Sequence, residues 1–582
     1  MSVLSARERQ QLLSPAAYEV RAQFDVKMKA RDGVRLSNDI YLPHAAGPFP
    51  TIVTRTPYEN SRDVNISWGI FYARRGYAAV IQDTRGRYDS EGEFYPWRSD
   101  ADDGDDTFEW VFNQAWCNGK IGTWGRSYGG VNQWYSMPRS NPHISAMSPQ
   151  VTPADNWESA HYVNGASQWG LNTLIVPVWN VSLSAAGRAD LFDWDSIFRI
   201  LPLRDADLAM IGRRCDYFQD WYAHPTYDQY WESFRWDDKY DRVHVPVRNQ
   251  CGWYDAYPGA TFKAWRGAVD QAPDPAVKRQ QRVLMGPWSH ADPTSSRLGE
   301  LDFGATAFRR LWLEDLRWYD ATLRDIDNGL LDEPRIELFV MGANEWRHED
   351  EWPLARTQFA AWYLHSGGRA NSLYGDGRVS TVAPDRAEPP DHYTYDPELP
   401  VPTLGGNHSM GGWPGRSVDP VPVGPLDQRP IERRDDVLVF TSEPLSEDTE
   451  VTGPIAATLY AASSARDTDW VLKLVDVYPD GRAIVLADGI RRARYRRGRV
   501  PPELIQPGEV YGYQVELAPT SNVFKAGHRI RVDVTSSNFP RFDRNLNTGE
   551  DIGAGTRMQS ARQTVFHTHD YPSHILLPMI PR

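Results

Sequence analysis

The sequence predicts an α/β protein that ends in a separate β-rich domain. Up to about residue 150, strand-like and helix-like segments alternate. A stretch rich in Trp, Tyr and Asp with little period-two alternation runs from 151 to 242, and alternating runs separated by Gly, Pro and Asp turns dominate from about 355. The chain has 582 residues, 41% of them hydrophobic and 24% charged, so several domains with large buried cores are expected.

The first 150 residues have the pattern of a mostly parallel sheet. Residues 19–43 predict a hairpin that turns at Asp32 and Gly33, and residues 51–56 and 77–83 predict buried strands. Residues 101–116 begin with acidic side chains and predict a helix. This alternation favours parallel strands joined by helical crossovers.

Residues 151–242 are predicted to form a mostly helical insertion. The uncharged run 164–187 is long enough to suggest a membrane segment, but its Asn, Gln, Ser and Pro residues favour a buried or pocket-lining segment. Strand-like residues 243–253 and 281–288, separated by the helix-like residues 259–271, indicate that the first sheet resumes in 243–354.

The last segment, 355–582, is predicted to be an antiparallel β-sandwich. Helical sequence patterns become rare in this segment, and runs of alternating apolar and polar residues recur between turn residues. The predicted strands lie within 359–366, 437–445, 453–464, 470–489, 511–521 and 528–539.

Composition excludes some classes of partner. The net charge is −14, and Lys and Arg form no basic stripe, so we expect no nucleic-acid partner. Cys117, Cys215 and Cys251 are widely spaced, which argues against a disulfide scaffold and fits a reducing compartment. The first twenty residues lack the apolar core of a signal peptide. We therefore expect a cytoplasmic protein with no membrane partner.

The stretch Gly125-Arg126-Ser127-Tyr128-Gly129 predicts a strand-to-helix elbow. A β-prone run precedes it and a helix-like segment follows. Such an elbow projects a serine hydroxyl clear of the backbone, towards a general base and beside a helix N-terminus, which a serine nucleophile requires. The pattern alone also fits an ordinary glycine turn.

Asp255 and His290, which lie further along the chain, complete the pattern of a serine nucleophile with its acid and base. Asp255 follows the strand-like segment that ends near 253, and His290 follows the next one. The order Ser, Asp, His, with each partner just past a later strand, is that of the α/β-hydrolase triad. The rival carboxylates Asp237, Asp238 and Asp241 precede the strand in a charged stretch.

Several motifs in one order give the chain a family resemblance. They occupy 28–43, 55–60, 82–94, 119–134, 251–257, 286–290 and 424–445. From about residue 20 to the C-terminus, the chain resembles the cocaine esterase-like hydrolases, which are related to X-Pro dipeptidyl-peptidases, glutaryl-cephalosporin acylases and α-amino acid ester hydrolases. The resemblance implies an α/β-hydrolase domain in two parts (1–150 and 243–354), a helical cap (151–242) and a C-terminal jelly-roll domain (355–582).

The resemblance also implies roles for individual residues. Ser127 would be the nucleophile, Asp255 the triad acid and His290 the base. An oxyanion hole would consist of the Tyr58 hydroxyl and the backbone N–H of Tyr128.

Aromatic residues in the segments that surround the acyl group in this family are candidates for substrate binding, although each also fits an ordinary core position. These candidates are Trp157, Trp169 and Tyr257. The loop 404–417 lies where the family's jelly-roll domain reaches the active site, and it also fits a surface loop. Its candidates for contact with substrate are His408, Met410 and Trp413.

The predicted function is hydrolysis of a small carboxylic ester through an acyl-enzyme, with no metal or organic cofactor. Asp155 and Glu158 supply only part of the carboxylate cluster that would bind an α-amino group, so a neutral or aromatic acyl group is expected. An amide-cleaving acylase or X-Pro-type peptidase of the same fold stays open. So does a binding protein that has lost catalysis. The oligomeric state is open as well, with a homodimer as one option.

Overall fold

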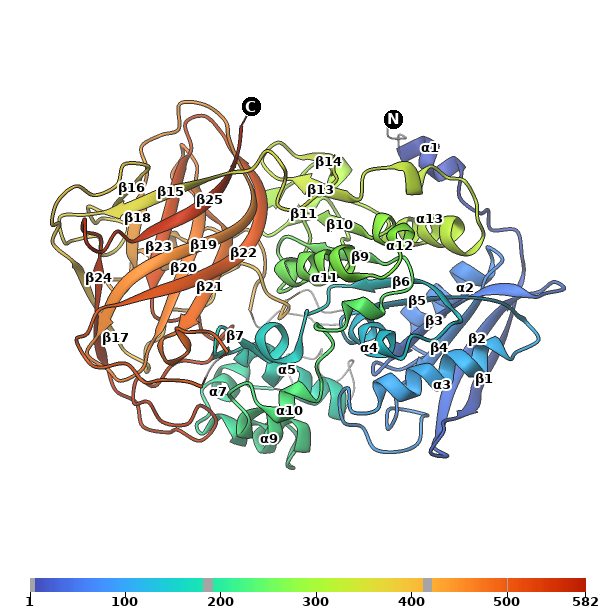
Figure 1. The fold of residues 1–582 in the computed structure, drawn as a ribbon. Helices are drawn as coiled ribbons and strands as arrows, with labels where there is room; N and C mark the ends of the chain where they lie inside the picture. Colours follow the sequence, from blue (N-terminus) through green and yellow to red (C-terminus); the bar gives the residue numbers. More distant parts are fainter. Residues whose placement is uncertain (1–5, 182–191, 412–420, 500, 582) are drawn as a thin grey trace.

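The computed structural model describes residues 6–181, 192–411, 421–499 and 501–581 (Figure 1). The C-terminal strands, orange and red in Figure 1, lie beside the α/β part of the chain. The helical segment that contains α5, α7, α9 and α10 lies against both.

The first sheet has ten strands, in the order β1-β2-β4-β3-β5-β6-β9-β10-β13-β14. Neighbouring strands from β4 through β13 are parallel, and the pairs at both edges are antiparallel. This confirms the predicted α/β class. The strands are β1 (Val20–Lys29), β2 (Arg35–Pro43), β3 (Phe49–Thr56), β4 (Ala78–Asp83), β5 (Cys117–Arg126), β6 (Ile144–Gln150), β9 (Arg248–Gly252), β10 (Arg282–Gly286), β13 (Ile336–Val340) and β14 (Glu345–Glu349).

Both faces of this sheet are buried. In β4, Ala78 and Val80 belong to one hydrophobic cluster, whereas Ala79 and Ile81 belong to another on the opposite face. Strands buried on both faces have continuous rather than alternating apolar runs. Helices α3 (Asp100–Phe112), α4 (Tyr128–Ser136) and α11 (Pro258–Gln271) contribute to the first cluster, and α2 (Asp63–Ala73) and α13 (Leu311–Leu323) to the second. The short helices α1 (Ala6–Gln11) and α12 (Pro275–Arg279) complete this part.

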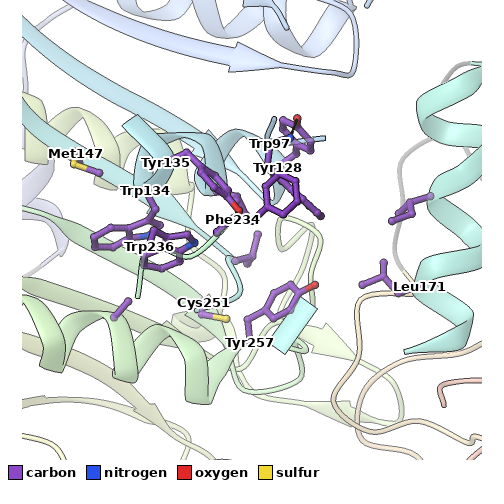
Figure 2. Close-up of a cluster of buried hydrophobic side chains, with 14 of the residues drawn as sticks. Trp97, Tyr128, Trp134, Tyr135, Met147, Leu171, Phe234, Trp236, Cys251 and Tyr257 are labelled. Atoms are coloured by element: carbon purple, nitrogen blue, oxygen red, sulfur yellow. Dashed lines mark hydrogen bonds between the residues drawn. The ribbon is translucent and has the colours of Figure 1, made fainter. Parts of the chain in front are cut away.

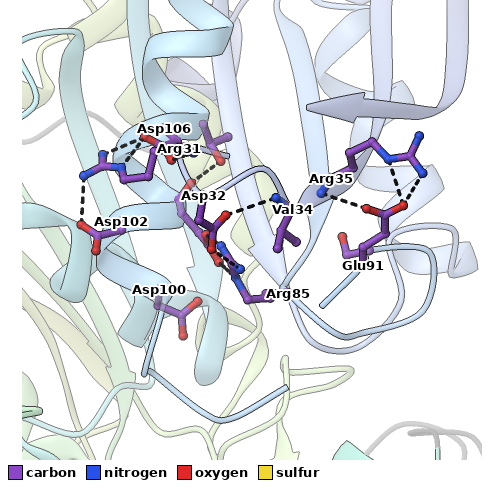
Figure 3. Close-up of polar contacts among 12 residues, drawn as sticks. Arg31, Asp32, Val34, Arg35, Arg85, Glu91, Asp100, Asp102 and Asp106 are labelled. Carbon is purple, nitrogen blue, oxygen red and sulfur yellow. Dashed lines mark hydrogen bonds and ion pairs between the residues drawn. The ribbon is translucent and has the colours of Figure 1, made fainter. Parts of the chain in front are cut away.

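The predicted hairpin at Asp32 and Gly33 joins β1 to β2 and is tied to α3 by ion pairs (Figure 3). Arg31 lies 2.7 Å from carboxylate oxygens of both Asp105 and Asp106. Arg85 bridges the hairpin and the helix, because it lies 2.6 Å from Asp32 and 2.6 Å from Asp103. Part of the resemblance motifs 28–43 and 82–94 therefore stabilises the fold rather than acting in a site.

The segment between β6 and β9 is mostly helical. Its main helix, α5 (Trp169–Asn180), is buried along all but its last residue. Across the described ranges, no helix has the length and apolar character needed to cross a membrane. The other described elements are the π-helical turn η2 (Asn156–His161), β7 (Tyr162–Val163), β8 (Ala166–Ser167), α7 (Trp194–Phe198), the short turn η4 (Leu203–Asp205), α8 (Ala206–Ile211), α9 (Asp216–Ala223), α10 (Gln229–Glu232) and the short turn η5 (Tyr240–Arg242).

The C-terminal strands form a second, closed β structure. β25 pairs with β15 on one side and with β19 on the other, so the sheet curls into a barrel around its own hydrophobic cluster. A β-rich C-terminal domain is confirmed, whereas its assignment as a jelly roll stays a prediction. Its elements are β15 (Gln358–His365), β16 (Arg378–Ser380), β17 (Asp391–Tyr395), α14 (Arg429–Glu432), β18 (Leu438–Thr441), β19 (Thr449–Ser463), β20 (Asp469–Val477), β21 (Ala483–Arg492), β22 (Tyr511–Phe524), β23 (Arg529–Thr535), β24 (Ala561–Phe566) and β25 (His574–Ile580).

The strands change from the first sheet to the barrel between β14 and β15, near the predicted division at 355. A small hairpin, β11 (Arg297–Leu298) and β12 (Leu301–Asp302), lies between β10 and α13. The division into 1–150, 151–242, 243–354 and 355–582 is retained as our proposed domain organisation.

Candidate active site

Ser127 lies at a sharp turn between β5 and α4. Its φ of 53° and ψ of −121° are rare for a residue with a side chain, and its N–H donates to the Gln150 carbonyl at 2.9 Å. Backbone strain of this kind costs about 1–3 kcal/mol and persists only where surrounding structure holds it. The turn therefore has the geometry of a nucleophile elbow.

Glycines make the turn sterically feasible. A Cβ at Gly125 would lie 2.2 Å from the Gly129 carbonyl oxygen, and one at Gly130 would lie 2.3 Å from the Thr152 methyl group. At Gly129, the nearest atom would be 3.2 Å away, which is tight but less severe. Close packing of β5 against α4 thus requires glycine most strongly at 125 and 130.

His290 and Asp255 form a hydrogen-bonded pair beside this turn. The imidazole Nδ1 lies 2.8 Å from Oδ2 of Asp255, whose side chain is fully buried. The other carboxylate oxygen of Asp255 accepts the Tyr257 N–H at 3.0 Å. The carboxylate therefore orients the ring so that Nε2 is the nitrogen left for chemistry.

Arg126 connects the loop that carries His290 to the strand that carries Ser127. Its Nη2 donates to the His290 carbonyl at 2.7 Å, and its Nη1 lies 2.8 Å from Asp292. Nη1 also donates to Oε1 of Gln150 at 3.1 Å. This side chain fixes the backbone of the His290 loop, a role that the sequence did not indicate.

The Tyr58 side chain lies between Ser127 and the cap. Burial raises the pKa of the Tyr58 hydroxyl, and the Ser127 and Trp179 side chains and the Tyr128 backbone N–H lower it by smaller amounts. These groups therefore surround the phenol oxygen. The Trp179 indole N–H makes no well-aligned hydrogen bond to any described residue. A protonated phenol beside a backbone N–H is the donor pair that an oxyanion hole needs.

The Tyr128 side chain makes structural hydrogen bonds, whereas its backbone N–H is the candidate oxyanion donor. Its hydroxyl donates to Oδ2 of Asp100 at 2.6 Å and accepts the Trp97 N–H at 3.1 Å. Asp100 is also paired with Arg55 at 3.1 Å. These contacts anchor the first residue of α4 to the start of α3.

Arg87 ties the Tyr58 loop to the cap. Its Nε donates to the Pro57 carbonyl at 3.0 Å, and its guanidinium also donates to the carbonyls of Val178 and Trp179 at the end of α5. A cation at a helix C-terminus is favourable because the carbonyls there carry partial negative charge. Arg87 therefore positions the Tyr58 loop and α5 relative to one another.

Ser127, His290 and Tyr58 line a single small cavity with about 50 Å³ of free volume. In Figure 2, Tyr128 and Tyr257 face Leu171 of α5 across this space. We call Tyr58, Ser127, Tyr257 and His290 the catalytic wall, and His161, Leu171, Ile175 and Trp179 the cap wall. The remaining lining residues are Trp97, Tyr128, Val131, Pro153, Ala160 and Ser409.

Of the three aromatic candidates for substrate binding, one lines the cavity and two do not. Tyr257 lines the cavity, with its ring 6.0 Å from that of His290. The structure does not bring Trp157 and Trp169 into this cavity. Their indole N–H groups donate to the carbonyls of Pro225 and Phe198 at 3.2 and 2.8 Å, and both rings are buried within the cap.

Sequence reasoning missed the cap wall, although part of it had a signal. Leu171, Ile175 and Trp179 are spaced four residues apart, so they share one face of α5. That spacing lies within the run 164–187, which was expected to be buried or to line a pocket. His161 and Trp97 had no comparable signal, because they come from an irregular turn and a loop.

Asp155 and Glu158 lie at the start of η2 and are paired with cations. Arg499 Nη2 lies 3.1 Å from Asp155 and 2.8 Å from Glu158, and Lys263 lies 3.7 Å from Asp155. Their negative charge is therefore already neutralised, and neither residue lines the cavity.

The loop 404–417 reaches the site through Ser409, which lines the cavity. His408 is buried, with Nε2 3.1 Å from the Pro422 carbonyl. Met410 is buried beside Gly170 of α5. Trp413 lies outside the described residues.

Comparisons with known proteins cover almost the whole chain. Residues 32–292 match the X-Pro dipeptidyl-peptidase (S15 family), and residues 328–576 match the X-Pro dipeptidyl-peptidase C-terminal non-catalytic domain. Cocaine esterase from Rhodococcus sp. (strain MB1 Bresler) is 38% identical over 585 residues, which cover 96% of this chain and 98% of that protein.

Two solved structures are similar in fold along the same length. An aminopeptidase from the marine sediment archaeon Thaumarchaeota archaeon has a TM-score of 0.82 and 26% identity, covering 98% of this chain and 97% of its own. An α-amino acid ester hydrolase has a TM-score of 0.82 and 26% identity, covering 100% of this chain and 98% of its own. These proteins are named for hydrolysis of esters and of peptides.

Proposed function

The chain belongs to the cocaine esterase-like family and is a hydrolase, and on this premise we propose that it cleaves neutral carboxylic esters through an acyl-enzyme on Ser127. The observation that carries the proposal is the single cavity onto which Ser127, His290 and Tyr58 open, with Asp255 bonded to the far side of His290. This arrangement supports the assignment of Ser127 as nucleophile, His290 as base and Tyr58 as oxyanion donor.

In the first half-reaction, Ser127 Oγ attacks the ester carbonyl carbon while His290 Nε2 takes the serine proton. The carbonyl oxygen becomes an oxyanion in the tetrahedral intermediate. The bond to the alkoxy oxygen then breaks, and His290 returns its proton to that oxygen so that a neutral alcohol leaves. In the second half-reaction, His290 Nε2 takes a proton from a water molecule as the water oxygen attacks the acyl carbon. The bond from that carbon to Ser127 Oγ then breaks, His290 returns the proton to Oγ, and the acid leaves.

Electrostatics support this assignment. Asp255 is fully buried and bonded to Nδ1 of His290, so it stabilises the imidazolium that forms when Nε2 is protonated. Because burial raises the pKa of Tyr58, its hydroxyl stays protonated at neutral pH and can donate to the oxyanion. The backbone N–H of Tyr128 is the second donor.

The cavity favours a neutral acyl group. Apolar and aromatic side chains make up most of its lining, and its free volume is small. The carboxylates Asp155 and Glu158 are paired with Arg499 and lie outside the lining. An ammonium group on the acyl moiety would find no carboxylate in the described lining to replace its lost hydration.

Amide cleavage is a second candidate, because the fold is similar to that of an aminopeptidase. The same nucleophile, base and oxyanion donors would serve an amide. What differs is the leaving group, which must be protonated before the C–N bond breaks. Ester and anilide substrates with the same acyl group separate the two candidates.

The test is a set of time courses with 4-nitrophenyl acetate, butyrate and benzoate beside the matching 4-nitroanilides and an α-aminoacyl ester. We expect turnover of the neutral esters and its loss in Ser127→Ala. Ser136→Ala is the matched control, since Ser136 lies on the same helix with its hydroxyl donating to the Asn132 carbonyl at 2.8 Å. Full activity in Ser127→Ala would overturn the proposal, and faster anilide cleavage would favour the amide candidate.

A further inference from the structure

His161 is a polar residue in the wall opposite the nucleophile. It ends the π-helical turn η2, lines the same cavity as Ser127 and is only 2% exposed. π-Helical turns are rare and occur frequently at functional sites. The proposed reaction does not use this side chain, so its presence beside the acyl position calls for another explanation.

Asn172 sets the tautomer of the His161 ring. The side-chain N–H₂ of Asn172 donates to the His161 carbonyl at 3.3 Å and to the Ser167 hydroxyl at 3.2 Å. Its Oδ1 is therefore the atom that faces Nδ1 of His161, at 2.7 Å. Since that oxygen can only accept, Nδ1 must carry the proton and Nε2 must be a bare acceptor.

Nε2 of His161 has no hydrogen-bond partner among the described residues. The ring is stacked on Trp221 with centroids 3.9 Å apart, and burial lowers the pKa of His161 to about 3. The imidazole is therefore neutral at neutral pH, and Nε2 is an unprotonated acceptor. A buried acceptor without a partner destabilises the fold unless a ligand supplies a donor.

The Trp97 side chain packs beside the His161 ring. The ring of Trp97 also lines the cavity, with its centroid 5.2 Å from that of His161. Its indole N–H is buried and makes no hydrogen bond within the described ranges. A hydroxyl group supplies the donor that Nε2 of His161 lacks.

We propose that His161 Nε2, beside Trp97, forms a polar subsite that selects acyl groups bearing a hydrogen-bond donor, and hydroxybenzoyl groups in particular. The inference rests on the proposed function, because it assigns the acyl group to the cavity that contains Ser127. An aromatic acyl group matches the apolar lining, and its hydroxyl donates to Nε2. An acyl group without a donor leaves Nε2 unsatisfied, which is how buried polar groups discriminate between substrates.

The test compares, at neutral pH, kcat/KM for phenyl benzoate, phenyl 3-hydroxybenzoate, phenyl 4-hydroxybenzoate and the two methoxy analogues, each methoxybenzoate serving as the electronic reference for its hydroxybenzoate. We expect one hydroxybenzoate to exceed benzoate by about 10-fold, the value of one hydrogen bond. The corresponding methoxybenzoate, which cannot donate, should lose that advantage. Burial keeps the His161 imidazole neutral, and the substrate phenol donates only while it is protonated, so the ratio should hold at neutral pH and fall as the phenol ionises at alkaline pH.

Two variants assign the preference to His161. His161→Phe removes the acceptor and should abolish the preference, whereas His161→Gln keeps an acceptor oxygen and should retain part of it. Trp231→Phe is the matched control, because Trp231 packs on His161 with centroids 5.6 Å apart but does not line the cavity. It should leave the ratio of hydroxybenzoate to benzoate unchanged.

The outcomes are distinct. Equal rates for benzoate and both hydroxybenzoates in the wild type, or the same ratio in His161→Phe, would overturn the subsite. Either result would leave the esterase proposal intact, provided that phenyl benzoate is still hydrolysed in a reaction that depends on Ser127. The wild-type substrate series decides the question even where a variant folds poorly. Absence of Ser127-dependent turnover on every ester would instead overturn the proposed function and the subsite with it.

Discussion

The two walls of the cavity are built in different ways. On the catalytic wall, Ser127 and His290 lie on loops that directly follow parallel strands, and Asp255 and Arg126 hold the His290 loop. The cap wall is one face of a buried helix and one irregular turn, and it leaves Nε2 of His161 without a partner. The difference supports our proposal that residues next to the sheet carry out the reaction, whereas the cap selects the acyl group.

The barrel takes part in the cap wall although it supplies few lining residues. The Gly170 N–H at the start of α5 donates to the Pro540 carbonyl at 2.8 Å, and the Ser167 N–H donates to Asp543 at 2.7 Å. Asp543 is in turn paired with Arg492 at 2.9 Å. The C-terminal domain therefore holds the helix that faces the nucleophile.

Substitutions in the catalytic wall, or in Asp255 behind it, that remove a group used in the reaction should lower kcat for every ester alike. The largest effect is expected for Asp255→Asn, because an amide would favour the wrong tautomer of His290 and would not stabilise the imidazolium. We expect kcat to fall by about 10⁴ with little change in thermal stability. Asp241→Asn is the control, since its carboxylate is largely exposed and 3.8 Å from Arg242. A comparable loss in both variants would contradict the assignment of Asp255.

Tyr58→Phe removes one oxyanion donor and leaves the nucleophile and base in place. We expect kcat to fall by about 10²–10³ for all acyl groups while KM changes little. Tyr319→Phe, which removes a buried hydroxyl bonded to the Thr123 carbonyl on the other face of the sheet, should keep its activity. Steady-state kinetics of the two variants measure this, and an unchanged kcat in Tyr58→Phe would remove Tyr58 from the oxyanion hole.

Substitutions on the cap wall should instead change the ratio between substrates. Leu171→Ala enlarges the cavity opposite Tyr257, so kcat/KM for benzoate should rise by about 10-fold relative to acetate. Leu208→Ala, on the exposed surface of α8, should leave the ratio unchanged. A uniform loss for all esters in Leu171→Ala would show that the cap wall serves catalysis rather than selectivity.

The smallest expected effect is on thermal stability and concerns Asp83, which holds the loop that carries Tyr58. Asp83 is buried at the end of β4 and accepts the Asn60 N–H of the Tyr58 loop at 2.8 Å. Burial raises the pKa of Asp83 to about 7. A carboxyl whose pKa is higher in the folded state binds more protons there, so its contribution to stability falls as pH rises from its unfolded pKa to about 7.

Asp83→Asn removes this titration. The Tm of the variant minus the Tm of the wild type should therefore increase by a few degrees between about pH 5 and about pH 8. Calorimetry at the two pH values gives the comparison. A difference in Tm that is independent of pH would mean that Asp83 is ionised in the folded protein throughout this range.

The catalytic wall was predictable because its determinants are local. A strand, a turn and a helix fix Ser127, and the positions after later strands fix Asp255 and His290, since parallel strands end at one edge of the sheet. The fold class followed from the same alternation. Gly125 and its neighbours gave an additional signal, because only residues without a side chain allow β5 and α4 to approach so closely.

The cap wall could not be predicted because its determinants are distant in sequence. The orientation of α5 depends on contacts with residues near 540, and a count of aromatic residues does not show which of them face a cavity. Trp157 and Trp169 are buried with satisfied N–H groups, whereas Trp97 and Trp179 line the site. His161 becomes informative only once the partner of each ring nitrogen is known.

The central claim is that Ser127 is an activated nucleophile, and covalent labelling tests it most directly. The intact mass of the protein would be measured after brief exposure to a fluorophosphonate, followed by peptide mapping of the label. We predict one label per chain, on Ser127, with labelling much slower in Asp255→Asn and absent in Ser127→Ala. An enzyme that hydrolyses esters while Ser127 stays unlabelled, or a label on another residue, would contradict the account.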